Sequence, residues 1–131
     1  MRAMCFRALL TWVVMGIAYN GISLARVSQG HSALAPTDPI AGALFVGVIG
    51  SLLLWTFLRH WRIYRWISVV ATMLLAYSGI YLHVVNRLQD PTLPLYLSTF
   101  WWTLAIGINA LGVSALIASQ LRGAQPETPE S

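Results

Sequence analysis

Lysine is absent from this 131-residue chain, and charged residues of any kind make up only 9% of it. Soluble domains of similar size carry about 25% charged residues. A chain with so few charges cannot cover a water-exposed surface, and 57% of its residues are hydrophobic, with a mean hydropathy of +0.67. These shortages exclude an ordinary soluble domain and predict an integral membrane protein.

Cysteine occurs once, at Cys5, which excludes an internal disulfide, a CxxC redox pair and a multi-cysteine metal site. Acidic residues number four, with Asp38 and Asp90 in predicted loops and Glu127 and Glu130 in a polar tail. The sequence contains no nucleophile paired with a base, no carboxylate pair inside an apolar run and no glycine-rich phosphate loop. We therefore expect no enzymatic activity, no cofactor and no metal centre.

The three histidines are dispersed along the chain. His60 lies in an arginine-rich turn and His83 near the opposite end of its apolar run, so the two cannot share one haem. His31 is predicted on the same side of the membrane as His83, which leaves open whether they meet at an outer-face metal site. A quinone or lipid cleft between His83 and the tryptophan pair 101–102 is a further alternative.

Four apolar runs are each near the roughly 20 residues that cross a bilayer. They cover residues 8–25, 40–58, 66–85 and 95–121, and a polar tail follows at 122–131. Backbone groups in lipid must be satisfied internally, so each run is predicted to be a helix. The first run is interpreted as a retained helix, because its small-residue site lies well beyond its end. The predicted fold is an all-α integral membrane protein with four transmembrane helices in a single domain.

Arginine positions predict the orientation of these helices. Only Arg26 and Arg87 fall at the end of the helices joined by loops 27–39 and 86–94, whereas the other end carries six arginines: Arg2, Arg7, Arg59, Arg62, Arg65 and Arg122. Both termini and the basic turn at 59–65 are therefore expected in the cytoplasm. The lysine-free, alanine- and leucine-rich composition favours a bacterial inner membrane. Because the arginines flank apolar runs, they indicate topology, and no nucleic-acid partner is expected.

An internal repeat relates the first and third apolar runs at an offset of 58 residues. Residues 18–24, AYNGISL, align with residues 76–82, AYSGIYL. We interpret the match as two similar helical hairpins in the same orientation, against the simpler explanation of shared membrane composition. The repeated unit predicts close helix packing through Gly21 and Gly79. The alternative is a small polar site between the helices formed by Tyr19, Asn20, Tyr77 and Ser78.

Small residues recur at helical spacing in the second and fourth runs. The second carries Ala43, Gly47 and Ser51, and the fourth carries Thr103, Gly107, Ala110, Ser114 and Ala118. Such stripes let helix backbones approach closely in a membrane, either within the chain or against a partner. Asn109, near the middle of the fourth run, is predicted to form an interhelical hydrogen bond or to line a substrate path.

Asp, Glu, Lys and Arg are missing from the interior of every apolar run. Proton-coupled transporters usually need such a group, so this class is excluded. At the basic turn, Arg59, Arg62 and Arg65 stand beside tryptophans and are predicted to dock lipid headgroups or an acidic partner.

The sequence therefore favours a non-enzymatic accessory or structural subunit of a larger membrane complex. Expected partners are membrane lipids and either other membrane subunits or further copies of the chain. One alternative is a small oligomeric pore or facilitative transporter, with a path lined by Asn20, Tyr77 and Asn109. Another is a lipid- or quinone-binding helper of a membrane enzyme.

Overall fold

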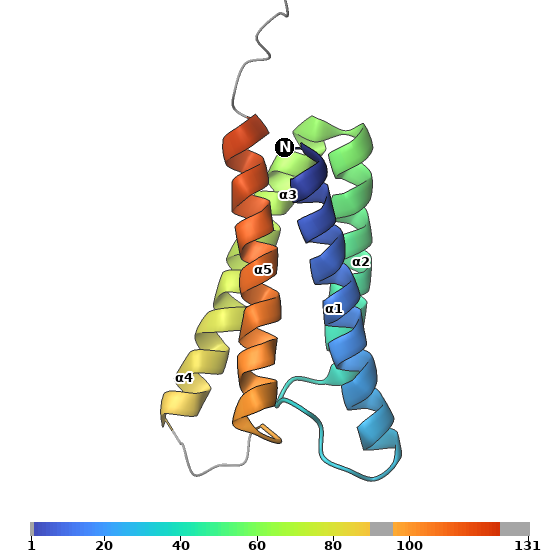
Figure 1. Cartoon of the computed structure of the whole chain (residues 1–131), viewed down its shortest axis with the longest axis vertical. Helices are drawn as coiled ribbons and strands as arrows, with labels where there is room; N and C mark the ends of the chain where they lie inside the picture. The colour runs from blue at the N-terminus through green and yellow to red at the C-terminus, as the bar shows by residue number, and fades with distance from the viewer. Residues whose placement is uncertain (1, 90–95, 124–131) are drawn as a thin grey trace, which may run out of the picture.

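A computed structural model describes residues 2–89 and 96–123, and within these ranges the chain forms helices and no strand (Figure 1). The elements are α1 (Arg2–Ser28), α2 (Pro39–Arg59), α3 (Trp61–Leu74), the π-helical segment η1 (Leu75–Tyr81), α4 (Leu82–Gln89) and α5 (Thr99–Gly123). Because α3, η1 and α4 are continuous, these described segments contain four helices long and apolar enough to cross a membrane. The prediction of an all-α, multi-pass membrane protein is confirmed at this level.

Successive spans run in opposite directions, so the bundle has two distinct ends (Figure 1). One end, here called the arginine-rich end, holds the start of α1, the junction of α2 and α3, and the end of α5. The other, the loop end, holds the connection between α1 and α2. Gly30 follows α1 with a positive φ of 79°, a conformation that glycine adopts without strain.

The junction of α2 and α3 is shorter than the predicted basic turn at 59–65. Only His60 is non-helical, and α3 begins at Trp61. The buried residues Tyr64, Ser68 and Ala71 explain the early start, because their spacing of four and three places them on one helix face. Arg62 and its neighbours therefore lie on the exposed side of a helix instead of in a loop.

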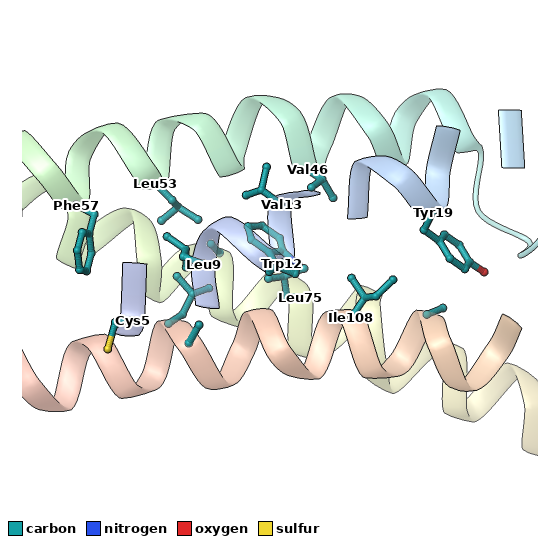
Figure 2. Packing of buried hydrophobic residues seen from close by; sticks show 14 of the residues in the cluster. Cys5, Leu9, Trp12, Val13, Tyr19, Val46, Leu53, Phe57, Leu75 and Ile108 are labelled. Carbon is teal, nitrogen blue, oxygen red and sulfur yellow. The ribbon is translucent and has the colours of Figure 1, made fainter. Parts of the chain in front are cut away.

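The tightest packing surrounds α1, which contacts α2 and α5 most extensively. Side chains of α1 fit against glycines of its neighbours. Figure 2 shows two of these side chains, Trp12 and Val13, within the buried cluster between the helices. A Cβ added at Gly50 would lie 3.2 Å from Val13 Cγ1, and one at Gly112 would lie 2.7 Å from two atoms of the Trp12 indole. Because Trp12 is fully buried, these glycines set how closely the three helices approach.

The third span is attached more loosely. Its first part, α3, contacts α2 and α5, and η1 contacts α5. Among the described residues, α2 makes no comparable contact with η1 or α4. The four spans therefore do not close into a symmetric bundle, and a space is left between α2 and η1.

Candidate functional site

A cavity of about 360 Å³ occupies the space between α2 and η1, in the half of the bundle nearer the loop end. Residues of all four spans and of the α1–α2 connection line it. Its volume lies in the lower part of the roughly 300–1,000 Å³ range of ligand pockets. None of its described lining residues is Asp, Glu, Lys or Arg. Its polar lining residues are Tyr19, Asn20, Ser23, Thr37, Ser78, His83 and Asn109.

Asn109 borders this cavity and ties α5 to the π-helical segment. Its Nδ2 donates to the carbonyl oxygen of Gly79 at 3.0 Å and to that of Ala105 at 3.0 Å. Carbonyl oxygens only accept hydrogen bonds, so both contacts require the amide nitrogen here and fix the orientation of the side chain. A Cβ at Gly79 would lie 2.7 Å from Asn109 Cγ, so the approach depends on glycine. Asn109 therefore holds two helices together.

On the opposite wall of the cavity, Asn20 of α1 lies close to Gly42 of α2, as Asn109 lies close to Gly79. The Nδ2 of Asn20 donates to the carbonyl of Gly16, four residues earlier on α1, at 2.8 Å. A Cβ at Gly42 on α2 would collide with its Oδ1. Neither Asn20 Oδ1 nor Asn109 Oδ1 accepts a hydrogen bond from any residue in the described ranges. Two asparagines thus flank the cavity, each placed against a glycine of the adjacent helix and each with a free acceptor.

His83 and Tyr96 close the cavity toward the loop end. His83 Nδ1 is hydrogen-bonded to Tyr96 Oη, and the His83 carbonyl accepts from Trp102 Nε1 at 3.1 Å. Tyr96 is buried, and this burial raises the pKa of its hydroxyl to about 12, although the nearby Arg87 opposes the shift. The hydroxyl is therefore protonated at neutral pH.

The loop between α1 and α2 covers the same end. The backbone N–H of Leu34 donates to Ser23 Oγ at 3.0 Å, and its carbonyl accepts from the N–H of Leu97 at 3.4 Å. Leu34 is fully buried. These contacts connect the α1–α2 loop to both α1 and the segment before α5, so the loop forms part of the wall next to His83.

The predicted polar group of Tyr19, Asn20, Tyr77 and Ser78 is assembled only in part. Tyr19, Asn20 and Ser78 line the cavity. Tyr77 does not line it, because 59% of its surface is exposed and its ring stacks on Tyr81 at a centroid distance of 5.7 Å. Tyr77 therefore lies outside the cavity that Asn20 and Asn109 border, and the path through these three residues stays a prediction. The wider turn of the π-helix shifts the phase of the residues within it, which the sequence repeat does not reveal.

The repeated tyrosines also differ in their contacts. Tyr19 is buried, donates its hydroxyl to the Trp101 carbonyl at 3.3 Å, and meets the Trp101 ring edge-on. It therefore joins α1 to α5, whereas Tyr77 contacts its own span. Aligned positions of the repeat thus lie in different environments.

The glycines divide into two groups that the sequence did not separate. Of those predicted to pack, Gly79 is buried, whereas Gly21, Gly47 and Gly107 have no atom within 4 Å of an added Cβ. The close internal approaches that sequence reasoning missed involve Gly16, Gly42, Gly50 and Gly112. These glycines lie opposite Val46, Asn20, Val13 and Trp12 of a neighbouring helix, so they can be recognised only once that helix is known.

The small-residue stripe of α5 lies largely on its outer side. Thr103, Gly107 and Ser114 are exposed, and Ser51 of the α2 stripe is exposed as well. These stripes therefore contribute little to the packing within one chain. We refer to Thr103, Gly107 and Ser114 as the outer α5 face.

No three His, Cys, Asp or Glu side chains gather as a metal site within residues 2–89 and 96–123. His31 is exposed in the α1–α2 loop, whereas His83 is buried against Tyr96. No protein-family model matches the chain, and neither the curated proteins nor the solved structures contain a match. Function must therefore be argued from the geometry alone.

Proposed function

We propose that this protein is a non-enzymatic accessory or structural subunit of a larger membrane assembly. The observation that carries the proposal is the outer α5 face, where Gly107 lies in open space. Glycine within a helix costs about 1 kcal/mol relative to alanine. Within the chain, Gly50 and Gly112 offset this cost through close packing, but Gly107 and Gly47 have no such contact. A second membrane protein, packed against these faces, would provide it.

The proposed assembly is oriented with the arginine-rich end in the cytoplasm of a bacterial inner membrane. Among the side chains described, Arg7, Arg59, Arg62 and Arg65 lie at this end, whereas Arg26 and Arg87 lie at the loop end. An excess of arginine on the cytoplasmic side is the usual topology of multi-pass proteins.

The two-hairpin organisation remains part of the proposal. In it, α1 pairs with α2, and the third span pairs with α5. The register match between residues 18–24 and 76–82 supports an ancestral duplication. The different burial of Tyr19 and Tyr77 then reflects divergence, with α1 taking the central position and the third span acquiring a π-helix. Exposed faces in such a diverged pair would be free for a partner.

The experiment that tests the proposal is affinity purification of a tagged chain from native nanodiscs, followed by mass spectrometry. We expect a distinct membrane protein at constant stoichiometry, and we expect Gly107→Leu to reduce its recovery at least about tenfold, since one bulky side chain blocks close helix approach. Val70→Leu is the matched control, because Val70 is exposed on α3 and already branched. Recovery of this chain alone, in wild type and variants alike, would refute an accessory role.

The cavity supports a second candidate function, in which the protein holds or passes a small uncharged molecule. This function includes both the facilitator and the lipid- or quinone-binding helper. Its support is the pair of free amide acceptors on Asn20 and Asn109, placed in a cavity without charged side chains. Amide oxygens of this kind would accept hydrogen bonds from a hydroxyl group.

Asn20→Leu tests this candidate more cleanly than Asn109→Leu, because the Asn20 amide bonds only to its own helix. Loss of glycerol flux in proteoliposomes, with the thermal stability of the protein unchanged, would favour a facilitator. Equal flux in wild-type, Asn20→Leu and protein-free liposomes would exclude it.

A further inference from the structure

A groove of about 260 Å³ lies at the arginine-rich end of the bundle, between α3 and α5. Its lining consists of Arg62, Arg65, Trp66, Val69 and Gln120. The first four residues have the spacing i, i+3, i+4 and i+7, so they share one face of α3. We call this feature the arginine groove.

The floor of the groove is held by Gln120 of α5. Its Nε2 donates to the carbonyl of Arg65 at 2.9 Å and is also hydrogen-bonded to Ser68 Oγ. A hydrogen bond between Tyr64 and Ser119, at 2.6 Å, joins the same two helices. These hydrogen bonds hold α3 against α5, so the exposed face of α3 is a fixed surface. Little conformational entropy of the protein would therefore be lost when a ligand binds there.

The groove carries positive charge that no described residue neutralises. Asp38 is the one carboxylate within residues 2–89 and 96–123, and it caps α2 at the loop end by accepting from the Ala41 N–H at 2.8 Å. Arg62 and Arg65 are both exposed on the opposite end of the bundle. Two exposed arginines one helical turn apart, with no carboxylate partner among the described residues, provide hydrogen-bond donors and charge of the kind that a phosphate accepts.

The apolar part of the groove continues away from the arginines toward the middle of the span. Trp66 is 77% exposed and Val69 is 39% exposed. Tryptophan is enriched at the headgroup level of membranes, and valine one turn further belongs in hydrocarbon. The order of charge, amphipathic ring and apolar side chain along α3 follows the order of phosphate, glycerol ester and acyl chain in a phospholipid.

We propose that the arginine groove binds one anionic phospholipid. Arg62 and Arg65 contact its phosphate, Trp66 lies against its ester region, and one acyl chain follows Val69 between α3 and α5. The proposed site includes only two of the three arginines in this basic cluster, because Arg59 is exposed but does not line the groove. The proposal is independent of the partner proposed for the outer α5 face.

The test measures phospholipid retention by native mass spectrometry of the full chain in detergent, titrated with dioleoyl phosphatidylglycerol. We expect one lipid per chain and a decrease in affinity of about tenfold or more in the Arg62→Gln/Arg65→Gln variant, the scale of a lost charge-assisted contact. Arg59→Gln removes one charge from the same cluster and should leave affinity unchanged. Thermal stability of both variants should match the wild type, since the three arginines are exposed.

Further ligands separate a lipid site from a site for phosphate alone. Glycerol 3-phosphate and inorganic phosphate share the headgroup chemistry but lack acyl chains, so we expect neither to displace the lipid. Dioleoyl phosphatidylcholine, a lipid without net charge, should bind at least about tenfold more weakly because the arginines select net negative charge. The proposal is overturned if Arg59→Gln weakens binding as much as Arg62→Gln/Arg65→Gln, or if inorganic phosphate displaces the lipid.

Discussion

The inner and outer faces of α5 differ in what their glycines do. Gly112 faces inward, and the Trp12 indole fills the space where a side chain would be. Gly107 is five residues earlier on the same helix, is exposed, and has no neighbouring atom within 4 Å of an added Cβ. The same residue type therefore has an evident packing role on one face and none on the other. The difference shows that α5 packs closely toward α1, whereas no described atom packs against Gly107.

A second contrast separates α1 from the third span. The centre of α1 is buried against two helices, whereas η1 packs mainly on α5 and leaves the cavity on its α2 side. π-Helical turns occur frequently at functional sites. Helix α1 is therefore the central packing element of the bundle, whereas the third span borders the open, polar-lined cavity.

Gly112→Val is expected to have the largest effect on the fold. Its Cβ would lie 2.7 Å from the buried Trp12 ring, and added bulk in a packed core typically costs about 1–3 kcal/mol, more where the neighbour cannot move. Thermal unfolding in detergent should therefore shift to much lower temperature. Gly107→Val is the matched control and should retain wild-type stability. If the two variants unfold alike, the contrast between the faces of α5 is wrong.

Gly107→Leu should leave the isolated chain folded while weakening its assembly. We expect at least about a tenfold loss of the co-purified partner, since small-residue contacts tolerate little added bulk. Gly47→Leu tests the corresponding face of α2. Quantitative mass spectrometry of nanodisc eluates measures the loss, with Val70→Leu as control. Unchanged recovery for both glycine variants would remove the basis for an external packing role.

Asn109→Ala and Asn20→Ala compare the two walls of the cavity. Asn109 bonds to a carbonyl of η1 and to one of its own helix, so its loss should cost about 1–2 kcal/mol. Asn20 bonds only within α1, so its loss should cost less, about 0.5 kcal/mol. Chemical unfolding of each variant measures the difference. Equal costs would show that the bond from Asn109 to Gly79 does not hold η1 in place.

The smallest expected effect concerns Tyr96 at the loop end. Because burial raises its pKa to about 12, the folded chain keeps the phenol protonated at pH values where the unfolded chain releases the proton, from about pH 10 upward. This contribution to stability is complete below pH 10 and is lost between pH 10 and 12. Comparison of wild type with Tyr96→Phe by thermal unfolding across that range should show a shallower decline in the variant. Parallel curves would mean that Tyr96 does not contribute.

The number and extent of the helices were largely predictable from sequence, because length, hydropathy and the scarcity of charge leave few alternatives in lipid. The start of α3 at Trp61 was not predicted, since three arginines in the basic turn suggested a loop. The relevant signal was the spacing of Tyr64, Ser68 and Ala71, which places the arginines on an exposed helix face.

The candidate site was predictable only in part. Asn20 and Asn109 stand out as polar residues within apolar runs, and both border the cavity. The position of Tyr77 outside the cavity could not be read from the sequence, because a π-helix changes which residues share a face and the repeat with Tyr19 carries no sign of it. His83 was predicted to lie at the membrane interface. Its hydrogen bond to Tyr96 was not predicted, because it forms between two segments that are separated in the sequence.

Site-specific photo-crosslinking in the native membrane tests the external packing role most directly. A photoreactive residue is placed at position 114 on the outer α5 face and, as a control, at position 70 on α3; both positions are exposed. We expect one discrete adduct with another membrane protein from position 114, lost on addition of Gly107→Leu, and no such adduct from position 70. Adducts only with lipid at both positions, or a protein adduct that persists in Gly107→Leu, would contradict the external packing role.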